Sequence, residues 1–573
     1  MKDSKTIHLL TPEGEALQAS SNATPWNTYP RPQMRRDSFL CLNGEWEVTL
    51  GNGEPRSILV PFPPESLLSG ICMPPQDVVA MMYRRNFTLP EGFHRGRVIL
   101  HFGAVDQCAR VFLNDRYLGQ HDGGYEAFSF DVTDCLQDEN RLVVECWDCL
   151  GPSILPYGKQ RRNRGGMWYT PVSGIWQTVW LESVPETYIR ALRIDTAANT
   201  ATITAEGVTR GTVTVTTPEG PLVCPLRGGT ATVTIPAPRL WSPEDPYLYE
   251  FTIEAGEDRV ESYFALRTLE IRRVDGIPRL CLNGKPYFLH ALLDQGYFSD
   301  GIYTPAAPEA YTRDVLAMKE LGFNTLRKHI KVEPEQFYYD CDRLGMLVMQ
   351  DMVNNGRYSF LRDTALPTIG VKSLSDTRLH RDRSTREAFL RGMEATVRQL
   401  YNHPCICYWT IFNEGWGQFD GTAAYRRLRE LDPTRFIDTA SGWFHGVESD
   451  VDSEHIYFKP VKLAYGDKPM VLSEFGGYAC KPAGHAFNPK GTYGYRFFAE
   501  QADFEDALIR LYEDEIIPAV SRGLCAAVYT QVSDVEDETN GLLSYDRKVT
   551  KVSAARMQAV AHKIASSLAE SHK

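Results

Sequence analysis

The first half of the chain shows the two-residue alternation of half-buried β-strands. Side chains in 140–148 alternate between two faces, and 97–102 and 177–182 are short runs of β-branched and aromatic residues. Turn residues separate these segments, and no helical repeat of useful length precedes about residue 305. Many short strands punctuated by turns are typical of a β-sandwich. We therefore predict a sandwich domain over residues 1–184.

A change in composition and residue pattern near residue 185 indicates a second domain. Residues 200–236 are rich in Thr and Val, alternate strictly, and contain turn residues at short intervals. This pattern favours a second, smaller sandwich, which we place at 185–270.

From about residue 285 the pattern changes to alternating strands and helices. Short, nearly continuous apolar runs, typical of fully buried parallel strands, alternate with segments of helical period. Eight such runs lie at 287–293, 324–330, 346–351, 405–414, 435–441, 454–458, 469–475 and 524–530. The connection between the fifth and the sixth has little helical character. Eight β/α units in this length predict a (β/α)8 barrel over 271–573.

Composition and charge narrow the possible functions. The chain has 573 residues, of which 43% are hydrophobic, and a formal net charge of -12. Nucleic-acid binding needs a concentrated basic surface, so we expect no nucleic-acid partner. No segment approaches the ~20 apolar residues of a spanning helix, so we expect no membrane association. The 13 scattered cysteines fit reduced thiols. We expect a soluble, cytoplasmic protein and leave assembly into a homo-oligomer open.

The residues that end the predicted barrel strands indicate where chemistry could occur, because reactive groups of such barrels lie at these ends. Strand four ends in Asn413-Glu414, strand seven ends in Ser473-Glu474, and strand two carries Arg327. Two carboxyls that face each other across the mouth supply what glycoside hydrolysis needs, a nucleophile and a proton donor. For either glutamate alone, a salt bridge or a metal ligand is the alternative.

The segment before Glu414 suggests how the two carboxyls could differ. Residues 408–412 contain four large aromatic or apolar side chains. Because apolar surroundings disfavour a charged carboxyl, we expect Glu414 to stay protonated in a half-dry mouth. Arg327 could keep the other carboxyl ionised through charge-assisted hydrogen bonds.

These segments also carry a resemblance to glycoside hydrolase family 2, the family of β-galactosidase, β-glucuronidase and β-mannosidase, from about residue 25 to 565. P-R-P-Q-M-R-R-D-S-F-L-C-L-N-G-E-W-E at 30–47 and W-Y-T-P-V-S-G-I-W-Q-T-V-W-L-E at 168–182 resemble the opening and the closing strand of the family's sugar-binding jelly roll. Y-N-H-P-C-I-C-Y-W-T-I-F-N-E at 401–414 is similar to the acid/base signature, and V-L-S-E-F-G-G at 471–477 is similar to the nucleophile signature. The resemblance implies a jelly roll, an immunoglobulin-like sandwich and a catalytic TIM barrel, in this order.

The resemblance also implies roles for individual residues. It makes Glu414 the acid/base and Glu474 the nucleophile of a retaining mechanism, with carboxyls about 5–5.5 Å apart. Asn413 would bind the sugar 2-hydroxyl, and Arg327 and Tyr457 would hold the nucleophile. No cofactor is implied. The metal ligands of some β-galactosidases have no clear counterpart, so we predict no required metal.

Departures from the family's patterns leave the sugar open. Strand two reads Arg327-Lys328-His329, one residue shorter than the usual Arg-x-x-His, and strand eight leads into 529–534 without the Trp-rich ending of β-galactosidases. The Asn-x-Lys pair that family β-glucuronidases place after strand eight is not found there. Asn-Pro-Lys occurs at 488–490, where loop composition is the plainer interpretation. We rank β-galactosides first, then β-glucuronides, β-mannosides and β-galactofuranosides or α-L-arabinofuranosides.

Other residues near strand ends are candidates for substrate binding. They are Asp294 after strand one, His329 on strand two, Asp351 at the end of strand three, and Trp416 and Trp443 past strands four and five. The tryptophans could equally pack in their loops, His329 could be a buried neutral histidine, and Asp351 could be a partner of Arg327. The basic stretch 158–166 is either a solvated loop or a loop that reaches from the jelly roll to the barrel mouth.

Together these features predict an exo-acting retaining β-glycosidase, with an oligosaccharide or glycoside as its partner. A non-catalytic carbohydrate-binding protein of the same fold is the alternative from another class, and an inverting hydrolase is a third. The intact pair Glu414 and Glu474 disfavours a protein without catalysis.

Overall fold

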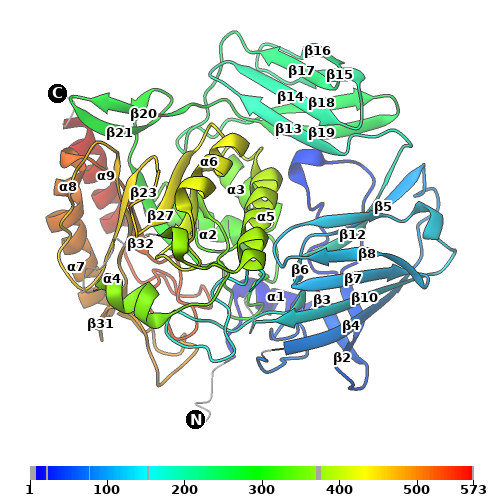
Figure 1. The fold of residues 1–573 in the computed structure, drawn as a ribbon, viewed down its shortest axis with the longest axis horizontal. Helices are drawn as coiled ribbons and strands as arrows, with labels where there is room; N and C mark the ends of the chain where they lie inside the picture. Colours follow the sequence, from blue (N-terminus) through cyan, green and yellow to red (C-terminus); the bar gives the residue numbers. More distant parts are fainter. Residues whose placement is uncertain (1–7, 21–22, 77, 151–153, 369–375, 571–573) are drawn as a thin grey trace.

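A computed structural model of the chain describes residues 8–20, 23–76, 78–150, 154–368 and 376–570. Figure 1 shows two β-sandwiches, in blue to cyan and in cyan to green, beside a larger body of strands and helices in green to red. The fold class expected from the sequence is confirmed. The domain boundaries drawn from the sequence stay a proposal.

The N-terminal sandwich consists of two facing antiparallel sheets. One has the strand order β1 (Leu40–Cys41), β12 (Val179–Val184), β5 (Arg97–Phe102), β9 (Phe128–Asp131). The other has the order β3 (Arg56–Val60), β2 (Gly44–Leu50), β4 (Val78–Phe87), β10 (Asn140–Cys149), β7 (Cys108–Leu113), β8 (Arg116–Asp122). A short pair, β6 (Val105–Asp106) and β11 (Gly174–Ile175), adjoins them. The alternation in 140–148 places Leu142, Val144 and Cys146 in the shared core, as the pattern predicts.

The second sandwich has its own apolar core. Its strands follow the order β13 (Ala191–Thr196), β14 (Thr200–Glu206), β17 (Thr230–Thr234), β16 (Leu222–Arg227), β15 (Arg210–Val215), β18 (Tyr249–Ala255), β19 (Asp258–Phe264). Ile203, Val213 and Val233 are fully buried in this core, while the Thr residues beside them face outward. A small sheet of β20 (Leu269–Val274), β21 (Ile277–Leu282) and β22 (Lys285–Pro286) leads into the barrel.

The barrel is built from eight parallel strands within the described part of the chain. Their order is β27 (Phe436–Ser441), β26 (Ile406–Asn413), β25 (Leu347–Asp351), β24 (Thr325–Lys328), β23 (Leu289–Asp294), β32 (Leu524–Thr530), β29 (Met470–Gly476), β28 (Asp452–Ile456). β27 and β28 pack side by side without a ladder among these residues, so the barrel is nearly closed. The eight strands match the eight apolar runs of the sequence.

Helices cover the outside of the barrel unevenly. They are α2 (Glu309–Glu320), α3 (Glu335–Leu344), α4 (Leu366–Thr368), α5 (Arg383–Leu400), α6 (Gly421–Leu431), α7 (Gln501–Leu511), α8 (Ile517–Arg522) and α9 (Ala554–Glu570). The helical segment before β32 is not one regular α-helix, because a π-helical turn, Tyr512–Ile516, joins α7 to α8. The connection from β27 to β28 is helix-free, as expected, and so is the one from β28 to β29. Before α7, the chain adds the short strands β30 (Tyr478–Cys480) and β31 (Arg496–Phe498).

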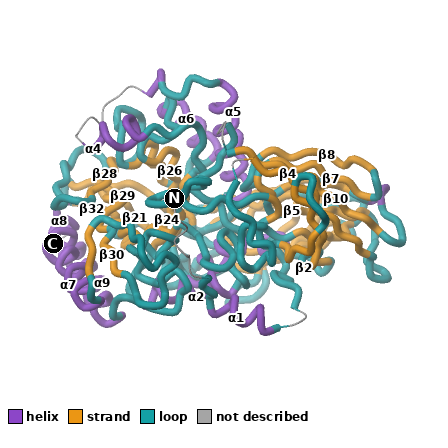
Figure 2. Tube along the Cα trace, turned by 90° about the horizontal axis from the view of Figure 1, so that it is seen from below, coloured by secondary structure: helices purple, strands orange, loops and turns teal. Residues whose placement is uncertain are grey.

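One helix lies where the sequence predicted none. α1 (Pro12–Ala19) begins at an N-cap, Thr11, whose side chain also donates to Asp300 in the loop after β23 (2.7 Å). A helix of this length that buries only Gly14 has no apolar face, so hydrophobic periodicity cannot reveal it. Figure 2 shows α1 at the lower edge of the molecule, near α2.

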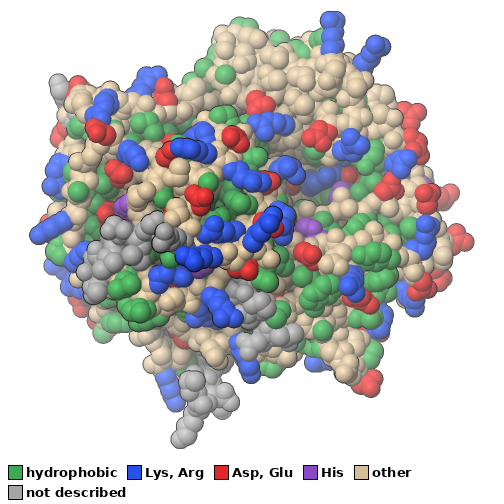
Figure 3. Space-filling model, in the orientation of Figure 1, with side chains coloured by type: hydrophobic (Ala, Val, Ile, Leu, Met, Phe, Trp, Pro, Cys, Tyr) green, Lys and Arg blue, Asp and Glu red, His purple; other side chains and the backbone are tan. Residues whose placement is uncertain are grey.

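The surface carries charges of both signs. Figure 3 shows Lys and Arg side chains gathered in the middle of the face on which α5 and α6 lie in Figure 1. Three arginines of α5 and α6, Arg383, Arg426 and Arg427, form ion pairs with glutamates. In the described residues, no helix combines the length and the apolar character needed to cross a membrane.

Candidate active site

The mouth of the barrel is formed where β26, β28 and β29 end. Every residue of β26 is buried, and Glu414 follows with a left-handed backbone (φ 52°). Gly415 continues this turn (φ 68°), and a Cβ there would lie 2.1 Å from the Phe444 ring. Glycine is therefore required at 415, and the sharp turn directs Glu414 out of the strand and over the mouth.

Irregular pairing positions the second carboxyl. The ladder between β29 and β32 shifts register between Leu472 and Phe475, next to Glu474. The ladder between β28 and β29 shifts at Glu454/His455, which sets His455 opposite Glu474. Such bulges change the direction of single side chains without ending a strand, and they are common beside active sites.

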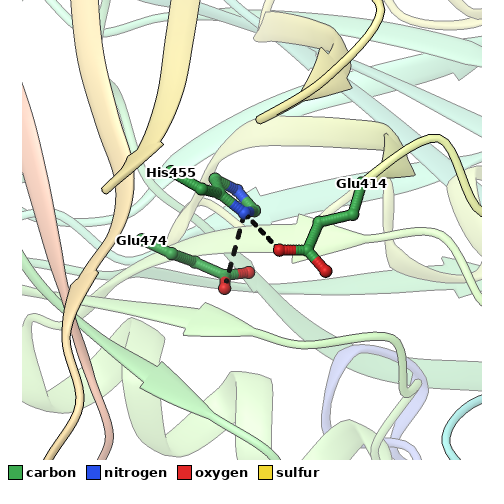
Figure 4. A group of neighbouring side chains, drawn as sticks. All are labelled: Glu414, His455 and Glu474. Atoms are coloured by element: carbon green, nitrogen blue, oxygen red, sulfur yellow. Dashed lines mark hydrogen bonds and ion pairs between the residues drawn. The ribbon is translucent and has the colours of Figure 1, made fainter. Parts of the chain in front are cut away.

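The two glutamates meet across the mouth with one histidine between them (Figure 4). Nδ1 of His455 lies 2.9 Å from Oε1 of Glu414 and 3.5 Å from Oε2 of Glu474. One donor atom from each of the three side chains lies within 4.8 Å of the others. This spacing agrees with the short separation of a retaining pair rather than the about 6.5–9.5 Å of an inverting pair.

Arg327 on β24 connects both sides of the site. Its Nη1 lies 3.2 Å from Oε1 of Glu474 and donates to the carbonyl of Ser473, and its Nη2 donates to Oδ1 of Asn413 (2.8 Å). Its Nε donates to Oδ1 of Asp351 (3.0 Å). The guanidinium is fully buried, so its planar set of donors fixes the strand ends relative to one another.

The surroundings of Glu474 keep it ionised. Burial raises the pKa of Glu474, but the charges of His455 and Arg327 outweigh it and lower the pKa to about 2. Tyr457 on the turn after β28 donates a hydrogen bond of 2.6 Å to Oε2. A carboxylate in this state can attack carbon at neutral pH.

The surroundings of Glu414 differ from the sequence-based expectation. The apolar side chains of 408–412 are packed in the core of the barrel domain, with Trp409 and Phe412 facing the surrounding helices, and each is at most 1% exposed. The Glu414 side chain itself is 23% exposed and contacts the imidazole of His455. The expected half-dry apolar wall is therefore wrong, because the aromatic run belongs to the strand and the carboxyl to the turn beyond it.

His455 is the residue of the site to which sequence reasoning gave no role. It lies at the end of β28 in the sequence, but its position between the glutamates depends on the bulge at Glu454/His455. Its Nε2 lies 3.1 Å from Oγ of Ser441 on β27, a contact that only the folded barrel creates.

His329 and Asp351 lie behind Arg327. Nδ1 of His329 lies 2.7 Å from Oδ2 of Asp351. Burial and the charge of Lys159 lower the pKa of His329 to about 4, so the ring is neutral at pH 7 with its proton on Nδ1. Nε2 then carries a lone pair and has no hydrogen-bond partner among the described residues. That atom can accept a hydrogen bond from a hydroxyl.

The other residues proposed from the sequence to bind substrate differ in their burial and in the protein groups that they already contact. Asp294 accepts from Lys328 (2.6 Å) and from the backbone of Gly296, so both of its oxygens have protein partners. Trp416 is 4% exposed and packs edge-on against Trp168 and other rings. Trp443 lies near the site, 5.6 Å from the His455 ring. Asn488 of the Asn-Pro-Lys segment accepts from the backbone of 490 and 491 and donates to Asp537, so it stabilises its own loop.

The basic stretch 158–166 reaches from the jelly roll to the barrel mouth. Tyr157 and Gly158 donate from their backbone to the carbonyl of Asn354 after β25. Farther along, Arg164 pairs with Glu536 after β32 (3.4 Å). The stretch therefore closes one side of the mouth, which decides between the two interpretations of the sequence.

A metal ion could meet donors here. Among the described residues, Glu414, His455 and Glu474 are the group whose donor atoms are close enough. Both oxygens of Glu474 already contact Arg327 and Tyr457, and a neighbouring guanidinium opposes a cation. That no metal is required stays a prediction.

Known proteins are similar to this chain in sequence and in domain architecture. The family description "Glycosyl hydrolases family 2, TIM barrel domain" matches residues 305–560, the sugar binding domain of that family matches 35–185, and a third family 2 description matches 187–267. The chain is 26% identical over 412 residues to a β-glucuronidase of Bacteroides fragilis, covering 66% of this chain and 56% of that protein. It is 26% identical over 379 residues to a β-galactosidase of Thermoanaerobacter pseudethanolicus, covering 61% of this chain and 46% of that one. The match thus spans about half the length of these relatives.

A solved structure is similar over nearly the whole chain. The β-D-glucuronidase of Dictyoglomus thermophilum superimposes with a TM-score of 0.72 at 17% identity, covering 94% of this chain and 98% of that one. At this identity the likeness concerns the fold. The three matched domains cover most of the sequence and show that the chain belongs to glycoside hydrolase family 2.

Proposed function

We propose that the protein is an exo-acting retaining β-glycosidase that removes a terminal non-reducing sugar by double displacement. The single observation that carries the proposal is the geometry at the mouth, where an ionised Glu474 lies across a short gap from Glu414. Membership of family 2 supports the same reaction class.

The two half-reactions assign opposite tasks to the pair. The Glu474 carboxylate attacks the anomeric carbon while Glu414 gives its proton to the departing glycosidic oxygen, which leaves a glycosyl ester on Glu474. Glu414 then takes a proton from water, whose oxygen attacks the anomeric carbon and releases Glu474. Asn413, held by Arg327, is positioned to bind the sugar 2-hydroxyl.

A panel of p-nitrophenyl glycosides tests this proposal. We expect turnover of at least one β-glycoside, a first-formed product that retains the β-configuration by proton NMR, and a 2-fluoro glycoside label on the peptide that contains Glu474. An inverted product or a label on another peptide would contradict the mechanism. A chain that binds sugars but turns over none of the panel would be a carbohydrate-binding protein.

For the sugar, β-galactosides keep the first rank that the sequence gave them, and one observation favours β-glucuronides as the second candidate. Lys159 on the basic stretch adds positive charge near Glu474 and Glu538, and within the described residues it has no ion pair. Its ammonium lies over the Tyr169 ring (5.9 Å to the centroid), and such a charge near the sugar site would attract the carboxylate of a uronic acid.

Two separate lysine substitutions distinguish β-glucuronides from β-galactosides as the substrate. If uronic acids are the substrate, Lys159→Ala lowers kcat/KM for p-nitrophenyl β-glucuronide by about 10–100-fold, the loss of one charge-assisted contact, and leaves β-galactoside turnover nearly unchanged. Lys490→Ala, at the exposed Asn-Pro-Lys loop, is the matched control and should change neither. An equal loss for both sugars would reject carboxylate recognition by Lys159.

A further inference from the structure

His455 lies within contact distance of both carboxyls, Glu414 and Glu474. Its side chain is 0% exposed, and its ring lies between the ends of β26 and β29 (Figure 4). A Cβ on Gly442 would lie 2.6 Å from this ring, so the backbone after β27 confines it on one side. Ser441 contacts Nε2 at 3.1 Å. The imidazole therefore has little freedom to turn away from the glutamates.

The contacts determine where the ring carries a proton. Nδ1 faces two carboxyl oxygens, at 2.9 Å and 3.5 Å, and Glu474 is ionised. A lone pair on Nδ1 would be repelled by these oxygens, so Nδ1 carries a hydrogen. The hydroxyl of Ser441 can either donate to Nε2 or accept from it, so it suits both the neutral and the charged ring. The resulting N–H is shared, with the shorter distance to Glu414.

We propose that His455 is a positioning residue that transfers its Nδ1–H hydrogen bond between the two carboxyls as the reaction proceeds. The proposal rests on the double displacement proposed above. In the free enzyme the N–H is shared between both oxygens. When Glu474 becomes a neutral ester, its oxygen is a weaker acceptor, and the N–H turns fully to Glu414. A hydrogen bond donated to a carboxyl favours the ionised form, so Glu414 becomes a base when water must be activated.

Other groups around the pair contribute a constant background. Arg327, His329, Lys159 and Tyr457 act on Glu474, while Tyr493 and Tyr495 sense the charge of Glu414. His455 contacts both carboxyls. Among the described residues, none of these other groups forms a hydrogen bond or ion pair with both of them. His455 is thus the group that couples the two.

Two substitutions separate hydrogen bonding from shape. In His455→Asn the amide nitrogen can occupy the place of Nδ1 and still donate, whereas His455→Leu fills the space without a donor. His485→Asn is the matched control, because His485 contacts Asp546 at 2.7 Å in a loop that is not part of the site. Each variant is assayed with a dinitrophenyl glycoside, whose leaving group needs no proton, so that hydrolysis of the glycosyl ester limits kcat.

We expect the acidic limb of kcat to move upward by about one pH unit in His455→Leu, because Glu414 loses the donor that favours its basic form. The Asn variant should keep a limb close to that of the parent. Azide, which attacks the glycosyl ester without a base, should restore turnover of the Leu variant at low pH. His485→Asn should show the parent profile.

A uniform loss of kcat at all pH values in both His455 variants, without azide rescue, would mean that the ring only supports the fold and would overturn the inference. An unchanged profile in His455→Leu would overturn it as well, while turnover by the parent enzyme leaves the proposed reaction intact. Failure of the parent to hydrolyse any aryl glycoside would reject the proposed reaction and the inference together.

Discussion

Three carboxyls of the jelly roll and the Glu474 carboxyl of the barrel mouth respond to burial in opposite ways. In the jelly roll, desolvation raises the pKa of Glu65 to about 8 and of Asp106 and Glu126 to about 7. In the barrel mouth, Glu474 is buried almost as fully as Asp106, yet its pKa falls to about 2. The barrel acid faces Arg327 and His455, whereas Asp106 accepts a hydrogen bond from the neutral amide of Gln160 (2.9 Å).

The difference shows that burial alone does not make a nucleophile. A dry carboxyl without a cation keeps its proton and serves only packing and hydrogen bonding. In the barrel mouth, the fully buried Arg327 helps to hold Glu474 ionised, and Glu414 lies partly in solvent. The site thus keeps Glu474 ionised through its charged partners, Arg327 and His455, although the carboxyl is buried.

The largest effect should follow loss of the ionised acid. Glu474→Gln keeps the shape and the hydrogen-bond acceptor but removes the attacking charge. We expect kcat with aryl glycosides to fall by about four orders of magnitude or more. Steady-state assays measure the loss, and the absence of a 2-fluoro glycoside label checks its cause. Retention of a tenth of the parent activity would contradict the assignment of the nucleophile.

Removal of the exposed acid should have an effect that depends on the leaving group. Glu414→Gln should lower kcat/KM by about 10²–10⁴-fold for a substrate with a poor leaving group, the usual contribution of general acid catalysis. For a dinitrophenyl glycoside the first step should be nearly unaffected. Equal losses across a series of leaving groups would show that Glu414 does not donate the proton.

Removal of the cation tests the comparison directly. Arg327→Met leaves Asp351 and Glu474 without their buried partner, so we expect the free energy of unfolding to fall by about 3–5 kcal/mol. Activity should fall by about two orders of magnitude, because Glu474 and Asn413 lose their position. Urea unfolding and kcat/KM measure the two effects. The control is Arg383→Met in an exposed ion pair, which should leave the free energy of unfolding nearly unchanged.

The smallest effect should come from the jelly roll. The pKa of Asp106 is raised on folding, so the folded state binds more protons than the unfolded state between pH 4 and 7, and stability falls as pH rises through about 7. Asp106→Asn should therefore be more stable than the parent at pH 8, by about 1–3 kcal/mol, and nearly equal to it at pH 4. Denaturant unfolding at both pH values measures this. A larger gain at pH 4 than at pH 8 would contradict the raised pKa.

The sequence predicted those features that depend on local pattern. Buried parallel strands are continuous apolar runs, so β26 and β29 could be located and Glu414 and Glu474 found at their ends. Arg327 could be assigned because it lies near the end of another barrel strand, β24. α1 was missed because eight residues that bury only Gly14 leave no periodic signal.

Features that depend on tertiary contacts could not be read from the pattern. The bulge at Glu454/His455 and the contact with Ser441 join three strands, and no local signal reports them. Likewise, the expected apolar surroundings of Glu414 followed from chain neighbours, whereas the left-handed turn at this residue separates it from them. Asp294 stays a candidate from the sequence, and its contact with Lys328 is a tertiary feature that the local pattern does not report.

The basic stretch 158–166 has a consequence for engineering. Since residues 158–166 of the jelly roll contact the loops after β25 and β32, a barrel expressed without the jelly roll would lack one side of its mouth. Grafting the first domain of one relative onto the barrel of another would transplant one side of the barrel mouth with it. Exchanging that domain would therefore change the shape and charge of the mouth while leaving Glu414 and Glu474 in place.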